Sequence, residues 1–230
     1  MRKARFLAAC LAAAASLLAS PAAAQLEHIT SRDAEGALKA ALERGSAAAV
    51  ASLGRQDGFF GNPLVKIPLP DSVQRAERLM RRFGMGEQAD ELVLALNRAA
   101  EAAVPEARDL LIDSVRKMTV QDAKGILQGG DTSATQYFRR STETQLRKRF
   151  LPIVQRATEK VELARYYNRY AERGAALGLM PSEDANLDHY VTQKTLDGLF
   201  FALAQEEKKL RDDPAAAGAA IIRRVFGALR

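Results

Sequence analysis

The residues best placed to bind a ligand lie in one unusual segment, residues 54–70. Glycines at 54, 58 and 61 let this chain turn tightly, and prolines at 63, 68 and 70 impose extended geometry. Asp57, Asn62 and Lys66 can supply polar contacts beside the aromatic ring of Phe59. These features predict a rigid loop that lines a binding pocket. The alternative is a long connection whose apolar side chains plug the end of a helical bundle, namely Phe59, Phe60, Leu64 and Ile67.

A second candidate site is the glycine-containing sequence from Gly129 to Ser133. Free backbone N–H groups at the start of a helix can hold a phosphate or carboxylate. However, Asp131 already places a negative charge there, and Asp131 or Thr132 can simply cap the helix. No lysine follows in the position that a nucleotide-binding P-loop requires. Asp131 and Thr132 are therefore candidate ligand contacts, with helix capping as the favoured interpretation.

The residue types needed for metal or covalent catalysis are scarce. The two histidines, His28 and His189, do not lie in a recognised zinc-binding or di-iron spacing, and no Gly-x-Ser-x-Gly elbow is present. The single cysteine, Cys10, lies in the N-terminal apolar run. We therefore predict no catalytic residue, no metal and no cofactor. A pair of carboxylates acting as a hydrolase on envelope polymers remains the enzymatic alternative.

The elements that must position these residues are predicted to be helices. Apolar residues recur every three or four positions along most of the chain, and no segment shows the alternation of a β-strand. Thr119 and Asp122 form a predicted capping box. The expected helices cover 30–53, 71–83, 87–104, 105–118, 119–129, 131–150, 152–174, 187–213 and 214–230. This pattern predicts an all-α fold, with residues 25–230 forming a single-domain bundle of about eight to nine helices.

The first 24 residues have the features of a cleavable export signal. Three cations precede an apolar run from Phe6 to Leu18, and small residues then offer a cleavage site between Ala24 and Gln25. Cleavage would leave 31 Lys and Arg against 28 Asp and Glu, lowering the formal charge from +6 to +3. We therefore expect a periplasmic or secreted protein with no nucleic-acid partner. Residues 7–10 also resemble a lipoprotein box, so anchoring through lipidated Cys10 is the alternative.

The C-terminal residues 215–230 have an amphipathic pattern. Their large apolar residues share one helical face, with arginines elsewhere: Ile221, Ile222, Val225, Phe226 and Leu229. Such a helix can dock on the bundle, which is the favoured interpretation, or make a weak contact with a membrane surface.

Three separated motifs support a resemblance to a known family. They are the loop at 54–70, the Gly129–Thr135 stretch, and the pair formed by Leu187–Thr192 and Leu196–Phe200. With these motifs the chain resembles the secreted bacterial proteins grouped as domain of unknown function 4197. The resemblance implies an exported, mostly helical, single-domain protein, and it implies no reaction, ligand or catalytic residue.

Taken together, these patterns predict a non-enzymatic envelope protein that binds a ligand or a protein partner near the 54–70 loop. The predicted ligand contacts are Asp57, Phe59, Asn62 and Lys66, with Asp131 and Thr132 as a second group. The envelope hydrolase and the peripheral membrane-surface protein are the alternatives.

Overall fold

The computed structural model describes residues 31–84, 86–176 and 186–213, and all the regular elements within these residues are helical. The long helices are α2 (Ser31–Leu53), α4 (Gly86–Ala103), α7 (Ser133–Thr158) and α9 (Leu187–Asp212). The shorter elements are α3 (Asp71–Arg82), the 3-10 turn η1 (Val104–Glu106), α5 (Ala107–Arg116), α6 (Val120–Gln128) and α8 (Glu162–Ala176). The predicted all-α fold is confirmed. The division into helices differs from the predicted one.

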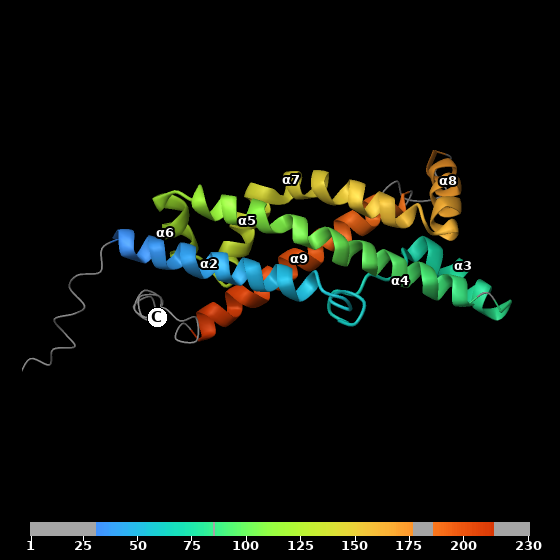
Figure 1. The fold of residues 1–230 in the computed structure, drawn as a ribbon, viewed down its shortest axis with the longest axis horizontal. Coiled ribbons are helices and arrows are strands. Elements are labelled where there is room, and N and C mark those ends of the chain that lie inside the picture. Colours follow the sequence, from blue (N-terminus) through green and yellow to red (C-terminus); the bar gives the residue numbers. More distant parts are fainter. Residues whose placement is uncertain (1–30, 85, 177–185, 214–230) are drawn as a thin grey trace, which may run out of the picture.

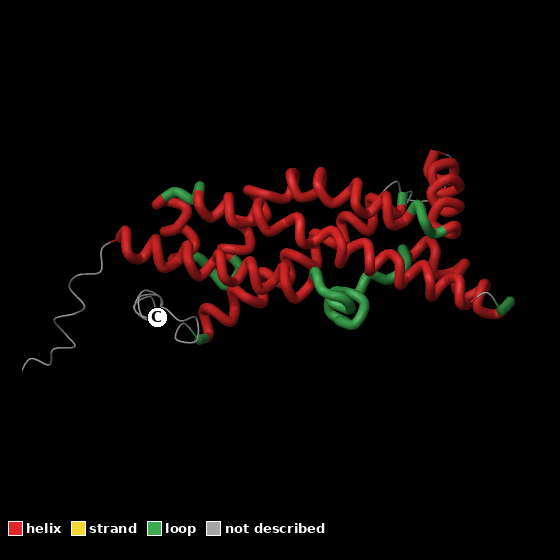
Figure 2. The backbone as a smooth tube through the Cα atoms, viewed as in Figure 1, coloured by secondary structure: helices red, strands yellow, loops and turns green. Residues whose placement is uncertain are grey.

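The bundle is elongated, with the long helices roughly following its length and α8 standing across one end (Figure 1). Helix α9 packs against α7, α2 and α4, and α7 packs in turn against α4, α5 and α6. The segment between α2 and α3, which contains the predicted loop, forms a compact coil on the side of the bundle (Figure 2). Because α9 contacts three of the long helices, side chains along its length can reach several different parts of the molecule.

The core combines large apolar side chains with alanine. Phe138, Phe150 and Phe200 are almost completely buried, and so are Ala100 and Ala103 of α4. Small side chains let helix backbones approach closely, and the aromatic rings fill the remaining space. All of these residues belong to one continuous apolar cluster.

The predicted break between two helices near Pro152 is wrong, because α7 continues through that proline to Thr158. Proline removes one hydrogen bond, to the carbonyl four residues earlier. Both Pro152 and Lys148 lie on the exposed side of α7, where water can satisfy that carbonyl. Phe150 and Val154 are buried on either side of the proline, and their packing holds the helix together.

Two predicted features of helix starts have different outcomes. The capping box of α6 is confirmed, since the Thr119 hydroxyl accepts from the Asp122 N–H at 3.1 Å and Asp122 accepts from the Thr119 N–H at 3.0 Å. At the start of α7, by contrast, the side chain of the N-cap residue Thr132 makes no capping bond. Glu207 fills that role, because its carboxylate accepts the N–H groups of Ala134 and Thr135.

Several predictions lie outside the described residues: the export signal with Cys10, its cleavage site, and the last helix at 214–230. Among the helices in the described part of the chain, none combines the length and apolarity needed to cross a bilayer.

Candidate functional site

Two buried side chains of α4, Asn97 and Glu101, hold the predicted binding loop through hydrogen bonds with its backbone. The carboxylate of Glu101 accepts the backbone N–H groups of Phe59 and Phe60 at 3.0 and 3.1 Å. Its other oxygen lies 2.5 Å from the guanidinium of Arg98. A buried carboxylate is costly unless it is paired and hydrogen-bonded, and Glu101 meets both conditions.

Asn97 holds the second half of the loop through its side-chain amide. Its oxygen accepts the N–H of Ile67 at 2.8 Å, and its nitrogen donates to the carbonyl of Ile67 at 2.8 Å. Asn97 is fully buried and also donates to the carbonyl of Val93 at 2.8 Å. The extended backbone at Ile67 therefore has its polar groups satisfied by a side chain, as a neighbouring strand would satisfy them.

Phe59, a predicted ligand contact, lies in the core. Its side chain is completely buried and packs against Gly198 of α9. A methyl group at position 198 would come within 2.6 Å of the Phe59 ring, so only glycine lets the ring and the helix approach this closely. Phe59 and Ile67 are buried in the bundle, as the alternative interpretation of the loop predicts, whereas Phe60 is partly buried and Leu64 is exposed.

Two of the predicted polar contacts, Asp57 and Asn62, interact within the chain. Asp57 has a φ of +62° and forms an ion pair with Arg98 at 2.7 Å. Asn62 accepts the N–H of Leu64 at 3.1 Å through its side-chain oxygen. These bonds shape the turn, a common use of Asp and Asn in loops.

Lys66 is the predicted contact that faces an open surface. It is exposed, and its ammonium group lies 4.0 Å from the centre of the Phe60 ring, within the range of a cation–π interaction. Lys66 also lines a depression of about 340 Å³ between the loop and α9. Lys194, Asp197 and Phe201 line the opposite side of that depression.

A second depression of about 650 Å³ adjoins the first, and the two share Pro68 and Lys194. Its further lining side chains come from α3, α7 and α9: Asp71, Arg147, His189, Tyr190 and Gln193. We call the two depressions together the α9 groove. The hydroxyl of Tyr190 donates to the carbonyl of Pro68 at 3.1 Å and ties the loop to α9 at the junction.

The α9 side of this groove was not predicted from the sequence. Lys194 and Phe201 are seven residues apart, which places them two turns apart on one face of a helix. The sequence does contain this spacing, but it gives no indication that the 54–70 loop packs beside it. The pairing depends on the tertiary contact between Phe59 and Gly198.

The second predicted site, at the start of α7, is filled by a side chain of the protein. The buried carboxylate of Glu207 accepts the N–H groups of Ala134 and Thr135 at 3.0 and 2.9 Å, and it pairs with Arg211 at 2.8 Å. Asp131 and Thr132 are exposed beside it. Because Glu207 already occupies the amides that could hold an external anion, we do not include Asp131 and Thr132 in the proposed site.

The two predicted sites are also separate in space. Gly198 and Glu207 are nine residues apart on α9, which corresponds to about 14 Å along the helix. The loop and the start of α7 therefore contact different parts of α9.

The carboxyl groups whose pKa is shifted, Asp90 and Asp122, do not resemble a catalytic acid. Hydrogen bonding to Arg81 lowers the pKa of Asp90, and hydrogen bonding to Thr119 lowers the pKa of Asp122. A general acid at neutral pH requires the opposite shift. In residues 31–84, 86–176 and 186–213, no group of three or more His, Cys, Asp or Glu side chains could hold a metal ion.

The sequence model of the family described as protein of unknown function (DUF4197) matches residues 28–227. The chain belongs to the DUF4197 family. The match confirms the resemblance predicted from the three motifs, two of which the structure brings together at the α9 groove. The remaining DUF4197 motif, at Gly129–Thr135, packs on Glu207.

The description of the DUF4197 family assigns no activity. Neither the curated proteins nor the solved structures compared with the chain include a match to it.

Proposed function

We propose that this DUF4197 chain is exported and acts as a non-enzymatic binding domain, with the α9 groove as its binding surface. The partner we propose is an acidic, extended chain segment with apolar side groups. The observation that carries the proposal is the pair of lysines, Lys66 and Lys194, that face each other across the groove.

The charges of the groove support an acidic partner. Lys66, Arg147 and Lys194 line it, whereas its carboxylates are Asp71 and Asp197. Among the ion pairs in the described residues, none involves Lys66 or Lys194, whose ammonium groups lie over the rings of Phe60 and Tyr190. Both cations can therefore accept a carboxylate without giving up an existing ion pair.

The carboxylates already have other partners. Asp197 accepts from Gln193 at 3.0 Å and lies 3.9 Å from Arg139, and Asp71 accepts from Gln74 at 2.8 Å. Arg147 is likewise paired with Glu143 at 3.3 Å, so Lys66 and Lys194 are the cations of the groove that make no ion pair within the described residues. Such a surface attracts acidic partners and raises their rate of association.

Apolar side chains flank the cations. Leu64 is 73% exposed and Phe201 is 36% exposed, and both line the depression that contains Lys66. Exposed apolar groups beside charged ones are typical of binding surfaces that combine apolar burial with charge pairing.

The length of the groove favours an extended chain. Its α9 side runs from His189 to Phe201, which is about 18 Å of helix. An extended segment of about five or six residues covers that distance.

The test uses fluorescent poly-L-glutamate and a copolymer of glutamate and tyrosine as probes, with binding to the purified mature chain followed by fluorescence anisotropy. Replacing both lysines by K66Q and K194Q should weaken binding of either polymer about 3- to 10-fold, since each exposed charge pair contributes up to about 1 kcal/mol. The control is K117Q with K124Q, which makes the same charge change on exposed residues of other elements.

A second pair of variants tests the apolar component. The unmodified chain should bind the copolymer more tightly than poly-L-glutamate, and L64S with F201S should remove that preference. Equal losses in the K66Q/K194Q and K117Q/K124Q variants would mean that net charge alone attracts the polymers. That result would reject the α9 groove as the binding surface.

A further inference from the structure

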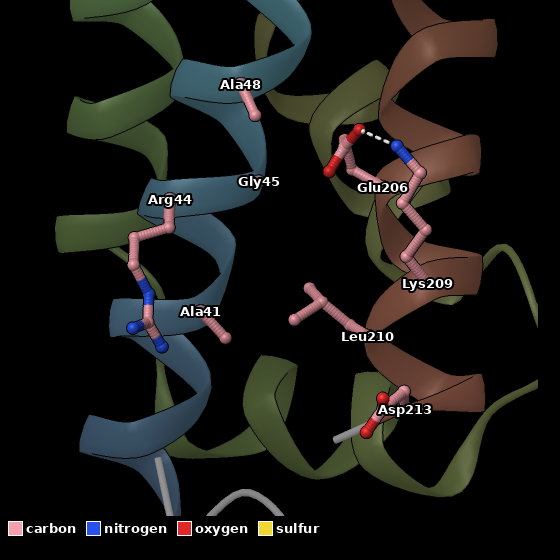
Figure 3. A pocket seen from close by; sticks show the side chains of 8 residues that line it. All are labelled: Ala41, Arg44, Gly45, Ala48, Glu206, Lys209, Leu210 and Asp213. Carbon is pink, nitrogen blue, oxygen red and sulfur yellow. Dashed lines mark hydrogen bonds and ion pairs between the residues drawn. The ribbon is translucent and has the colours of Figure 1, made fainter. Parts of the chain in front are cut away.

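A third depression lies away from the α9 groove, between α2 and the C-terminal end of α9 (Figure 3). Its volume is about 330 Å³. Ala41, Gly45 and Ala48 of α2 line one side, and Leu210 of α9 points toward them from the other. The ion pair between Glu206 and Lys209, at 2.7 Å, stands at the rim.

The small side chains of α2 leave this space open. Ala41, Gly45 and Ala48 follow one another at helical spacing on the side of α2 that faces α9. Ala41 is fully buried and Gly45 lies beside Glu206 and Leu210, whereas Ala48 is exposed, so the depression opens toward solvent at the Ala48 end.

The chain itself supplies a further segment, which follows the end of α9. Asp213, the last described residue, lines the depression. Pro214 cannot continue α9 without losing a hydrogen bond, which favours a change of direction there. The 17 residues that follow Asp213 would span about 26 Å as a helix, enough to run back along the depression.

The sequence of this segment matches the depression in chemistry. Its large apolar residues recur at helical spacing and share one face: Ile221, Ile222, Val225, Phe226 and Leu229. Burying side chains of this size stabilises a protein relative to leaving them in water. The small side chains and Leu210 can receive these groups, and the charged lining residues Arg44, Glu206, Lys209 and Asp213 surround them.

We propose that residues 214–230 fold back and dock their apolar face into the depression between α2 and α9. This contact is intramolecular, and it is independent of the partner proposed for the α9 groove. A second copy of the chain and a membrane surface are the competing occupants of the same apolar face.

Engineered cysteines test the contact in the mature chain, residues 25–230, which contains no cysteine of its own. Ala48→Cys is combined with Ile222→Cys or with Phe226→Cys, and the protein is oxidised mildly at low concentration. Docking predicts a disulfide within one chain, seen as faster migration without reductant. The matched control joins Lys117→Cys, on the exposed surface beyond α5, to the same partners and should remain reduced.

A chain ending at Asp213 provides the second measurement. Loss of the docked face should lower the melting temperature by about 4–8 °C, as expected for about 2 kcal/mol in a protein of this size. It should also raise the fluorescence of the apolar dye ANS several-fold, because the depression becomes uncovered.

Three results would overturn the proposal. An intermolecular disulfide would assign the face to a second copy. Sedimentation of the full mature chain with phosphatidylglycerol vesicles, lost on truncation while the melting temperature is unchanged, would assign it to a membrane. The absence of both a disulfide and a shift in melting temperature would show that the depression is left open.

Discussion

Two buried glutamates, at different places in the molecule, each accept backbone N–H groups from a distant segment of the chain. Glu101 accepts the N–H groups of two consecutive loop residues, and Glu207 accepts those of two consecutive residues at the start of α7. Each is also paired with an arginine on its own helix, Arg98 or Arg211. These four backbone N–H groups, which could otherwise hold an external anion, therefore join distant segments of the chain.

The first prediction at the residue scale concerns Glu101. Glu101→Gln should reduce the free energy of unfolding by about 2 kcal/mol, because two charge-assisted hydrogen bonds become neutral ones and the ion pair with Arg98 is lost. Urea unfolding followed by circular dichroism measures the change.

Asp57→Asn is the matched control, since it neutralises the other carboxylate paired with Arg98. Asp57 is largely exposed and should contribute less than about 1 kcal/mol. Equal effects of the two substitutions would contradict the view that Glu101 fixes the loop.

The roles of individual loop residues could be predicted only in part. The glycines, prolines and polar residues of 54–70 correctly mark an unusual loop, and Lys66 does line an open surface. The sequence does not reveal that Asp57 and the amides of Phe59 and Phe60 meet Arg98 and Glu101, about 40 residues later. Such partners follow from tertiary packing, which local sequence patterns do not encode.

At the scale of elements, α9 connects the site to the rest of the fold. Its middle part carries Gly198 against Phe59, and its last turns carry Glu207 against the start of α7. Periodicity predicts this helix well because its apolar stripe is long. Periodicity fails at Pro152, where burial of Phe150 and Val154 outweighs the local cost of proline within α7.

Gly198→Ala is the prediction that belongs to this scale. The added methyl would lie 2.6 Å from the Phe59 ring, so the ring or α9 must move, at a cost of about 1–3 kcal/mol. Differential scanning calorimetry should show a lower melting temperature.

Gly125→Ala in α6 makes the same change where nothing lies within 4 Å. That variant should gain up to about 1 kcal/mol from the better helix propensity of alanine. If both variants were stabilised, the close approach between the loop and α9 would not constrain the fold.

At the scale of the whole molecule, the net charge depends on whether the first 24 residues are removed. They contain three cations, the sole cysteine and no acidic residue. After their removal the remaining excess of positive charge is small, so the cations of the α9 groove matter through their position and not through a large overall field. The proposed groove and the proposed C-terminal contact both belong to the part of the chain that would remain.

The last prediction is therefore the N-terminus of the mature protein. When the full chain is expressed in a Gram-negative host, the periplasmic fraction should contain a protein that begins at Gln25, because the small residues before it form a cleavage site. Intact-mass spectrometry measures this, and Cys10→Ser should leave both the mass and the yield unchanged, since Cys10 would be discarded with the signal. A mature chain that begins at Cys10 and carries a diacylglyceryl group would instead establish lipid anchoring. In that case the residues before α2 would tether the bundle to a membrane, and the α9 groove would meet its acidic partner at that surface.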